Sequence, residues 1–232
     1  MKNETQQDLD TNQLSISDYF LNELTSKVVE FNKICFGDFK LLSNQEKADK
    51  INLQLDIVGE EMQGEYRKYY AKDMLEELDA IGDTLFTVSY LLYQLGVVNN
   101  LEDEKDIDEI NSLINQDRLE LIVMDYGSFS ETYMNHFDFD IIKEATDRII
   151  ANNQEKYTDD HVVFETWEIP DNEKLYPEWV ELGDKTFYLF VNENGKVRKR
   201  KGFPVVNLQD LVDKQVERFE EESPMEETNE EK

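Results

Sequence analysis

The stretch EELDAIGDTLFTVSYLLYQLG, residues 76–96, is the most strongly patterned segment of this chain. From Leu78 onward its apolar residues recur every three or four positions, which predicts a buried helix. Asp73 is suited to cap the start of this helix and Gly96 to end it, so we expect the helix to span residues 73–96. The chain also has only 9 Gly and 4 Pro, which argues against a turn-rich β architecture and leaves a mainly α fold as the expectation.

Two aspartates, Asp79 and Asp83, interrupt the apolar pattern of this helix. A spacing of four residues places them on nearly the same helix face, one turn apart. Two like charges there repel each other and both lose water, so the pair is costly unless a cation or strong donors compensate. Mg²⁺ would compensate, because it accepts carboxylate, water and phosphate oxygens as ligands. The alternative is that both aspartates lie at a solvated edge.

A second acidic group precedes this helix in IVGEEMQGEY, residues 57–66. It belongs to a helix that we predict over residues 45–72, and the very short linker between the two helices predicts an antiparallel hairpin. Glutamates on such a charge-rich helix can also be plain solvated surface. The acids that the hairpin would bring together are Glu60, Glu61 and Glu65 on the first helix, and Glu76, Asp79 and Asp83 on the second.

The rest of the chain is patterned less uniformly. Helical periodicity recurs in residues 16–36 and 137–157, whereas residues 99–126 suggest a loop with one or two short helices. HVVFETWEI (161–169) and KTFYLFVNENGKVRKR (185–200) are rich in β-forming residues, and Asn194-Gly195 indicates a hairpin turn. The expected organisation is a flexible N-terminus (1–15), a helical core (16–98), an insertion or linker (99–136), a further core helix (137–160), a β-containing appendage (161–212) and a disordered acidic tail (213–232).

The 232 residues carry a formal charge of −29, with 53 acidic against 24 basic residues. This balance disfavours binding to an extended nucleic acid. With one cysteine, Cys35, and without an evident signal peptide or membrane-spanning run, we expect a soluble, cytoplasmic protein. The basic residues concentrate in residues 196–201, either to protect an edge strand or to contact phosphate.

Several motifs, taken in their order along the chain, together resemble those of a known protein family. EFNKICFG (30–37), IVGEEMQGEY and the stretch quoted first resemble the MazG-like, all-α nucleoside triphosphate pyrophosphohydrolases, in particular the phage-type proteins similar to phosphoribosyl-ATP pyrophosphohydrolase. ANNQEKY (151–157) resembles the Asn- and Lys-bearing segment of that group, and NENGKVRKRKGF (192–203) its C-terminal hairpin. The core of the resemblance covers roughly residues 28–98.

The resemblance implies a helical bundle that forms a homodimer or homotetramer. It also implies Mg²⁺-dependent (or Mn²⁺-dependent) cleavage of a nucleoside triphosphate to a monophosphate and pyrophosphate. By position, the implied metal ligands are Glu61, Glu65, Asp79 and Asp83, the implied catalytic residues are Glu60 and Glu61, and the implied substrate contacts are Asn153 and Lys156. We add Lys199, from the basic cluster, as a predicted phosphate contact.

The chain departs from the family pattern at two acidic positions. Where a second glutamate usually follows three residues after Glu61, this chain has Gly64, and the acid stands at Glu65. Where the second motif usually has glutamate three residues before its aspartate, this chain has Ala80, and the acid stands at Asp79. Two alternatives stay open. The displaced acids could leave a protein that binds nucleotide without cleaving it, and the net charge of −29 suggests an acidic mimic of nucleic acid.

Overall fold

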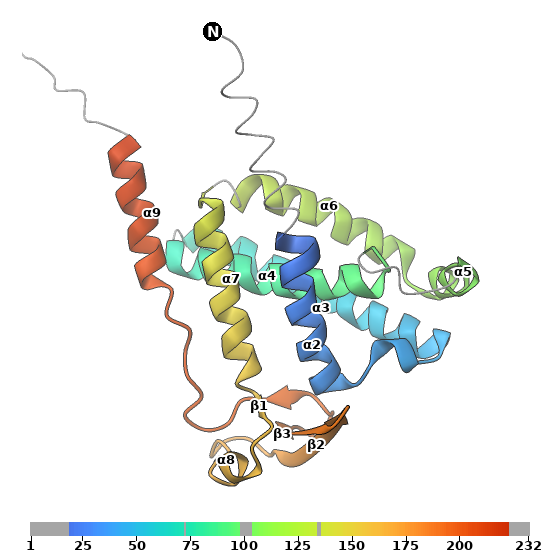
Figure 1. Cartoon of the computed structure of the whole chain (residues 1–232). Helices are drawn as coiled ribbons and strands as arrows, with labels where there is room; N and C mark the ends of the chain where they lie inside the picture. The colour runs from blue at the N-terminus through green and yellow to red at the C-terminus, as the bar shows by residue number, and fades with distance from the viewer. Residues whose placement is uncertain (1–18, 72, 98–103, 134–135, 223–232) are drawn as a thin grey trace, which may run out of the picture.

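The computed structural model describes residues 19–71, 73–97, 104–133 and 136–222, and over these residues the protein is mainly helical with one small antiparallel sheet (Figure 1). The mainly α prediction is therefore confirmed. The elements, in chain order, are η1 (Tyr19–Leu24, a π-helix), α2 (Thr25–Phe36), η2 (Phe39–Leu41), α3 (Asn44–Ala71), α4 (Met74–Gln94), α5 (Glu104–Leu113), α6 (Gln116–Tyr133), α7 (Phe139–Gln154), β1 (Tyr157–Thr158), α8 (His161–Glu165), β2 (Tyr176–Leu182), β3 (Lys185–Val191), β4 (Val197–Arg198) and α9 (Gln209–Glu222). Among them, no helix has the length and apolar character needed to span a membrane.

The α3–α4 hairpin is the centre of the fold, as predicted. Asp73 begins α4 by accepting hydrogen bonds from the backbone N–H groups of Leu75 and Glu76, which satisfies donors that the helix start leaves unpaired. The apolar stripes of the two helices are fully buried against each other and their neighbours. The buried residues that form these stripes include Ile51, Leu55, Val58, Leu78, Ile81 and Leu85.

Helix α4 also contacts α2, α7 and α9, so it is surrounded by other helices. It contacts α7 at Gly82, where a Cβ atom would lie 2.2 Å from the Ile149 side chain and 3.6 Å from the backbone Cα of Thr146. Both of these α7 residues are buried. A larger side chain at position 82 would therefore collide with the buried Ile149 side chain at this crossing.

Replacing Gly82 by leucine should destabilise the protein by about 1–3 kcal/mol, because the added atoms overpack the α4–α7 crossing. The matched control is Gly127→Leu on α6, where an added Cβ meets no atom within 4 Å. That change should leave stability unchanged or raise it, because leucine favours a helix more than glycine does. Denaturant unfolding of both variants checks the prediction, which equal effects at the two positions would contradict.

The segment 99–136, expected to be an insertion or linker with one or two short helices, supplies two helices, α5 and α6, both of which contact α3. Their buried residues Ile110, Ile114 and Ile122 belong to the same apolar cluster as the α3–α4 hairpin. In the described residues this segment is therefore part of the main core.

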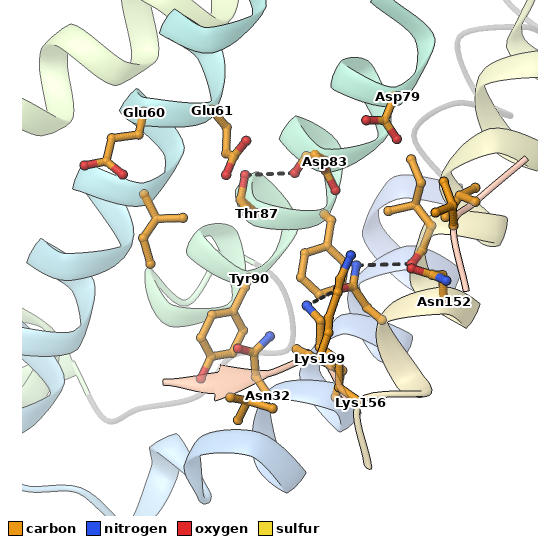
Figure 2. A pocket seen from close by; sticks show the side chains of 18 of the residues that line it. Asn32, Glu60, Glu61, Asp79, Asp83, Thr87, Tyr90, Asn152, Lys156 and Lys199 are labelled. Atoms are coloured by element: carbon orange, nitrogen blue, oxygen red, sulfur yellow. Dashed lines mark hydrogen bonds between the residues drawn. The ribbon is translucent and has the colours of Figure 1, made fainter. Parts of the chain in front are cut away.

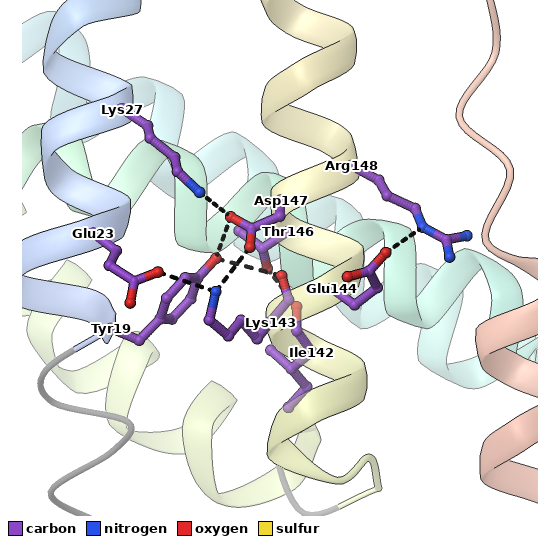
Figure 3. Close-up of polar contacts among 9 residues, drawn as sticks. All are labelled: Tyr19, Glu23, Lys27, Ile142, Lys143, Glu144, Thr146, Asp147 and Arg148. Atoms are coloured by element: carbon purple, nitrogen blue, oxygen red, sulfur yellow. Dashed lines mark hydrogen bonds and ion pairs between the residues drawn. The ribbon is translucent and has the colours of Figure 1, made fainter.

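Polar contacts join the N-terminal helices to α7 (Figure 3). The Asp147 carboxylate accepts hydrogen bonds from Lys27 Nζ at 2.7 Å, from the Tyr19 hydroxyl at 3.3 Å and from Lys143 Nζ at 2.9 Å. Burial alone would raise the pKa of Asp147, but the bonds from Lys27 and Lys143 outweigh it and hold this pKa below its ordinary value. The network fixes how α2 and α7 lie relative to each other.

The sheet packs below the helices in the view of Figure 1. Its strand order is β1-β3-β2, with β4 also paired to β3, and all pairs are antiparallel. Gly195 has a φ of 72°, which confirms the turn predicted at Asn194-Gly195. Phe31 and Cys35 of α2 pack with Leu189 and Val197 of the sheet in a second apolar cluster, so the sheet is attached to α2.

Two predictions for the C-terminal part are wrong. Residues 161–165 form helix α8 rather than a strand, because Asp160 caps the backbone N–H groups of Val162 and Val163. The segment 213–222, predicted as part of a disordered tail, belongs to α9. Residues 223–232 and the predicted flexible N-terminus, residues 1–15, lie outside the described residues.

Helix α9 is held by both apolar and charged contacts. Leu208, Leu211 and Val212 are buried in the main core, and the buried Gln215 accepts a hydrogen bond from the backbone N–H of Asp138 at 2.8 Å. Charged residues of α7 and of its N-cap, Asp138, form ion pairs with residues of opposite charge on α9. These ion pairs are Arg148–Asp210, Lys214–Asp140, Arg218–Asp138 and Arg218–Asp140.

Candidate functional site

A pocket of about 590 Å³ lies between α2, α3, α4 and α7 and is closed by residues of the C-terminal part. Figure 2 shows the carboxylates of α3 and α4 on one side of this pocket and Lys156 and Lys199 on another. The strap, residues 203–208, connects the sheet to α9 and contributes Val206 and Leu208 to the lining. Two side chains of α7 hold the strap: Asn152 Nδ2 donates to Pro204 O at 2.8 Å and Arg148 Nη1 donates to Asn207 O at 3.0 Å.

The acidic wall of the pocket contains most of the acids singled out in the sequence. Glu61, Asp79 and Asp83 are half-buried, whereas Glu60 and Glu76 are exposed. The α3–α4 hairpin places Glu61 next to Thr87 and Asp83 (Figure 2). The side chain of Glu65 lies outside the described part of the structure. The residues of the acidic wall are Glu60, Glu61, Glu76, Asp79 and Asp83.

The acidic wall offers carboxylate oxygens, which suit a hard cation such as Mg²⁺. Among the described residues, however, no three Asp, Glu, His or Cys side chains lie close enough together to hold an ion by themselves. Mg²⁺ in proteins is commonly held by one or two carboxylates together with substrate phosphates and water. The donors therefore fit an ion that is shared with a bound phosphate, and they do not form a preformed cage.

The lysine cluster, Lys156, Lys196 and Lys199, lies in the same pocket. Lys156 donates a hydrogen bond to Asn153 Oδ1 and lies 5.8 Å from the Phe31 ring centre. Asn153, Lys156 and Lys199 were all predicted as substrate contacts, and all three line the pocket. Lys196 was expected only as a member of the basic segment 196–201, with either an edge-strand or a phosphate-contact role.

The other basic residues of the 196–201 segment have carboxylate partners. Arg198 pairs with Glu173 at 2.8 Å, Arg200 with Glu155 at 3.4 Å and Lys201 with Asp171 at 3.0 Å. Within the described part of the chain, neither Lys196 nor Lys199 forms an ion pair. The basic segment is therefore divided into residues that stabilise the sheet and two residues that face the pocket.

The charge of Lys156 is held in an unfavourable environment. Burial lowers the pKa of Lys156 to about 8, and nearby Lys199 and Lys196 act in the same direction, while Cys35 and Asp83 oppose them. Burial also raises the pKa of the Cys35 thiol to about 12, against the opposing charge of Lys156. Lys156 thus needs an anion beside it to keep its full charge above neutral pH.

Polar side chains that the sequence analysis did not single out line another part of the pocket. Asn32 is 6% exposed and donates from Nδ2 to Val28 O at 2.9 Å, and Gln54 is 8% exposed and donates from Nε2 to Thr87 O at 2.8 Å. Neither amide oxygen accepts a hydrogen bond from the residues that the structure describes. In the sequence, Asn32 and Gln54 are polar residues next to positions of an apolar stripe. Such a pattern is common in helices and does not by itself indicate a binding site.

Aromatic rings surround these amides. Phe31 and Phe86 pack edge to face with ring centres 5.4 Å apart, and Phe36 and Tyr90 also line the pocket. Burial raises the pKa of Tyr90, so its hydroxyl stays protonated at neutral pH and can donate a hydrogen bond. This part of the pocket can therefore accept a flat ring that carries hydrogen-bonding groups.

Comparison of the chain with protein-family models, with curated proteins and with solved structures finds no match in any of the three.

Proposed function

We propose that the protein is a MazG-like nucleoside triphosphate pyrophosphohydrolase that uses Mg²⁺, or Mn²⁺, to cleave a nucleotide into a monophosphate and pyrophosphate. The observation that carries the proposal is a pocket with an acidic wall on one side and, on another, a lysine cluster. As a cytoplasmic enzyme it would act on the nucleotide pool, and by the same resemblance it would work as a homodimer or homotetramer. Light scattering coupled to size exclusion measures that assembly.

Electrostatics favours a phosphate-rich ligand. Three cations held together repel one another, and for Lys156 burial adds a further cost. A triphosphate would relieve this repulsion by forming charge-assisted hydrogen bonds with the lysines. The acidic wall would repel the same ligand unless a divalent cation lay between carboxylates and phosphates. A metal-bound triphosphate would balance the charge of both the acidic wall and the lysine cluster. A metal-free anion would balance the lysines alone, and a simple cation the acidic wall alone.

The neutral part of the pocket favours a nucleoside over a bare polyphosphate. The amide oxygens of Asn32 and Gln54 would accept hydrogen bonds from a base or sugar, and the rings of Phe31, Phe36 and Phe86 would contact a planar base. A pocket of about 590 Å³ is in the size range of small-molecule sites.

The residues would divide the reaction between them. One or two of the carboxylates of Glu61, Asp79 and Asp83, together with the substrate phosphates, would hold the metal ion, which would supply charge neutralisation and a more acidic water. Glu60, exposed at the mouth of the acidic wall, or Glu61 would accept the proton of the attacking water. Lys156 and Lys199 would stabilise the negative charge that develops on the leaving pyrophosphate. Asn153 would orient Lys156 through the hydrogen bond between them.

A screen of the common ribo- and deoxyribonucleoside triphosphates with Mg²⁺, scored by pyrophosphate and monophosphate release, tests the proposal. We expect turnover of at least one triphosphate and none when the metal is chelated. Release of orthophosphate in place of pyrophosphate would overturn it. Saturable nucleotide binding without turnover would instead support a non-catalytic nucleotide-binding protein, which the lack of a preformed three-acid group among the described residues favours as the second candidate.

The Gln54→Leu variant should weaken binding of nucleotides about 5- to 10-fold, because the pocket then loses one buried hydrogen-bonding amide. Binding of inorganic tripolyphosphate, which has no base or sugar, should stay unchanged. The matched control is Gln63→Leu, an exposed position later in α3. Calorimetric titration of both ligands against both variants provides the measurement, and an equal loss for the two ligands would contradict the assignment.

A further inference from the structure

The turn between β3 and β4, residues 192–196, is fixed by several hydrogen bonds. Asn192 Oδ1 accepts from the backbone N–H of Asn194 at 3.1 Å and of Lys196 at 2.9 Å, and the Asn192 N–H donates to Lys196 O at 3.0 Å. Gly195 supplies the positive φ that closes the turn. The backbone of Lys196 is therefore held in place, while its side chain is exposed and lines the pocket.

The charge of Lys196 is not explained by the stability of the sheet. Its neighbours Arg198 and Lys201 form ion pairs with acidic residues of the same C-terminal part, but Lys196 pairs with no carboxylate among the described residues. It lies instead close enough to Lys156 to oppose the charge of that residue. A fixed turn that adds a cation to an existing cluster of cations indicates a binding role for an anion.

The three lysines differ in depth. Lys156 is half-buried beside the Phe31 ring, whereas Lys196 and Lys199 are exposed. A single phosphate at the inner end would be held by Lys156, and a longer phosphate chain would extend toward the outer lysines. The number of lysine contacts then increases with the number of phosphates.

We propose that Lys196 binds the terminal phosphates of the substrate, so that the β3–β4 turn selects ligands by the length of their phosphate chain. The proposal rests on the proposed function in its choice of ligand. The sheet, which packs on α2, would then contribute to the choice of substrate.

Titration calorimetry of inorganic phosphate, pyrophosphate and tripolyphosphate, with Mg²⁺ at low ionic strength, tests this role in the full-length protein. The variant is Lys196→Gln, and the control is Lys201→Gln, which removes a charge from the same segment but outside the pocket. We expect tripolyphosphate to bind the Lys196→Gln variant about 5- to 10-fold more weakly, phosphate to change less than about 2-fold, and Lys201→Gln to resemble the wild type. Lys196→Arg should retain the preference for long chains.

Three outcomes would overturn the proposal: equal weakening for all three anions, no weakening in Lys196→Gln, or failure of the wild-type protein to bind tripolyphosphate. The first two would leave Lys196 as a general surface charge that protects the sheet edge. These results are distinct from a failure of the proposed function. A protein that shows the expected chain-length preference but releases no pyrophosphate from any nucleotide would keep this role for Lys196 and lose the enzymatic assignment.

Discussion

The Asp83→Asn variant should lose pyrophosphate release by about 100-fold or more, which is the largest effect that we expect from a single substitution. Asparagine keeps the size and shape of the side chain but removes the negative charge that would hold a cation against the substrate phosphates. Asp83 is half-buried on α4, beside Glu61 and near Lys156. Its charge therefore acts in a partly desolvated pocket, where electrostatic interactions are stronger than at the surface.

The matched control for this variant is Asp49→Asn, an exposed aspartate of α3 outside the pocket. That change should leave turnover within about 2-fold of the wild type, as is usual for an isolated surface charge. Unfolding curves of both variants separate loss of activity from loss of fold. Full turnover by Asp83→Asn would show that the negative charge of Asp83 is not needed for the reaction, which would contradict the proposed role of the acidic wall.

Replacing Lys156 by methionine should have opposite effects on binding and on stability. Affinity for a metal-bound triphosphate at pH 7 should fall by about 10- to 100-fold, because a desolvated cation at the inner end of the lysine cluster is lost. Stability of the ligand-free protein at the same pH should rise, by about 1–3 kcal/mol, because a charge no longer has to be buried. Methionine fills similar space beside Phe31, so packing changes little.

The stability gain should depend on pH in a defined direction. The folded pKa of Lys156 is about 8, below its ordinary value of 10.5, so between these values the unfolded chain binds more protons than the folded chain. Wild-type stability from this group therefore rises with pH across that window, and the advantage of Lys156→Met disappears near its upper end. Denaturant titrations at pH 7 and pH 10.5 measure this difference, and a constant advantage would show that packing rather than charge is the cause.

The helices that carry the acidic wall could be predicted from sequence because each has a long, regular apolar stripe, and Asp73 and Gly96 mark the ends of the second helix. Helix α4 begins after its predicted cap, Asp73, and α3 spans Asn44–Ala71 against an expected 45–72. The antiparallel hairpin followed from the short linker. The placement of Glu61 and Asp83 in one pocket then followed from this hairpin together with helical spacing.

The remaining elements depend on contacts that local sequence does not reveal. β-forming residues in HVVFE suggested a strand, but the Asp160 side chain caps a short helix there instead. The acidic composition of α9 suggested disorder, but Arg148 of α7 pairs with Asp210, and apolar residues such as Leu211 reach the main core. Long-range pairing of this kind is a tertiary property.

The same limit applies to the pocket. Asn32 and Gln54 belong to helices whose buried faces were predicted, yet which polar residue faces a cavity depends on how three helices pack. Lys196 and Lys199 could be separated from Arg198 and Lys201 after the carboxylate partners of the latter two were known. Composition locates a basic segment, and tertiary structure decides which of its charges is available.

The pocket is completed by residues that are synthesised late. The acidic wall is encoded before residue 90, whereas Lys196, Lys199 and the strap lie beyond residue 195 and reach the pocket after α7 and the sheet have been made. During translation, a chain still attached to the ribosome can therefore fold its central helices while its anion-binding side is missing. Anion binding in this pocket should therefore begin after the sheet and residues 203–208 have folded against the central helices.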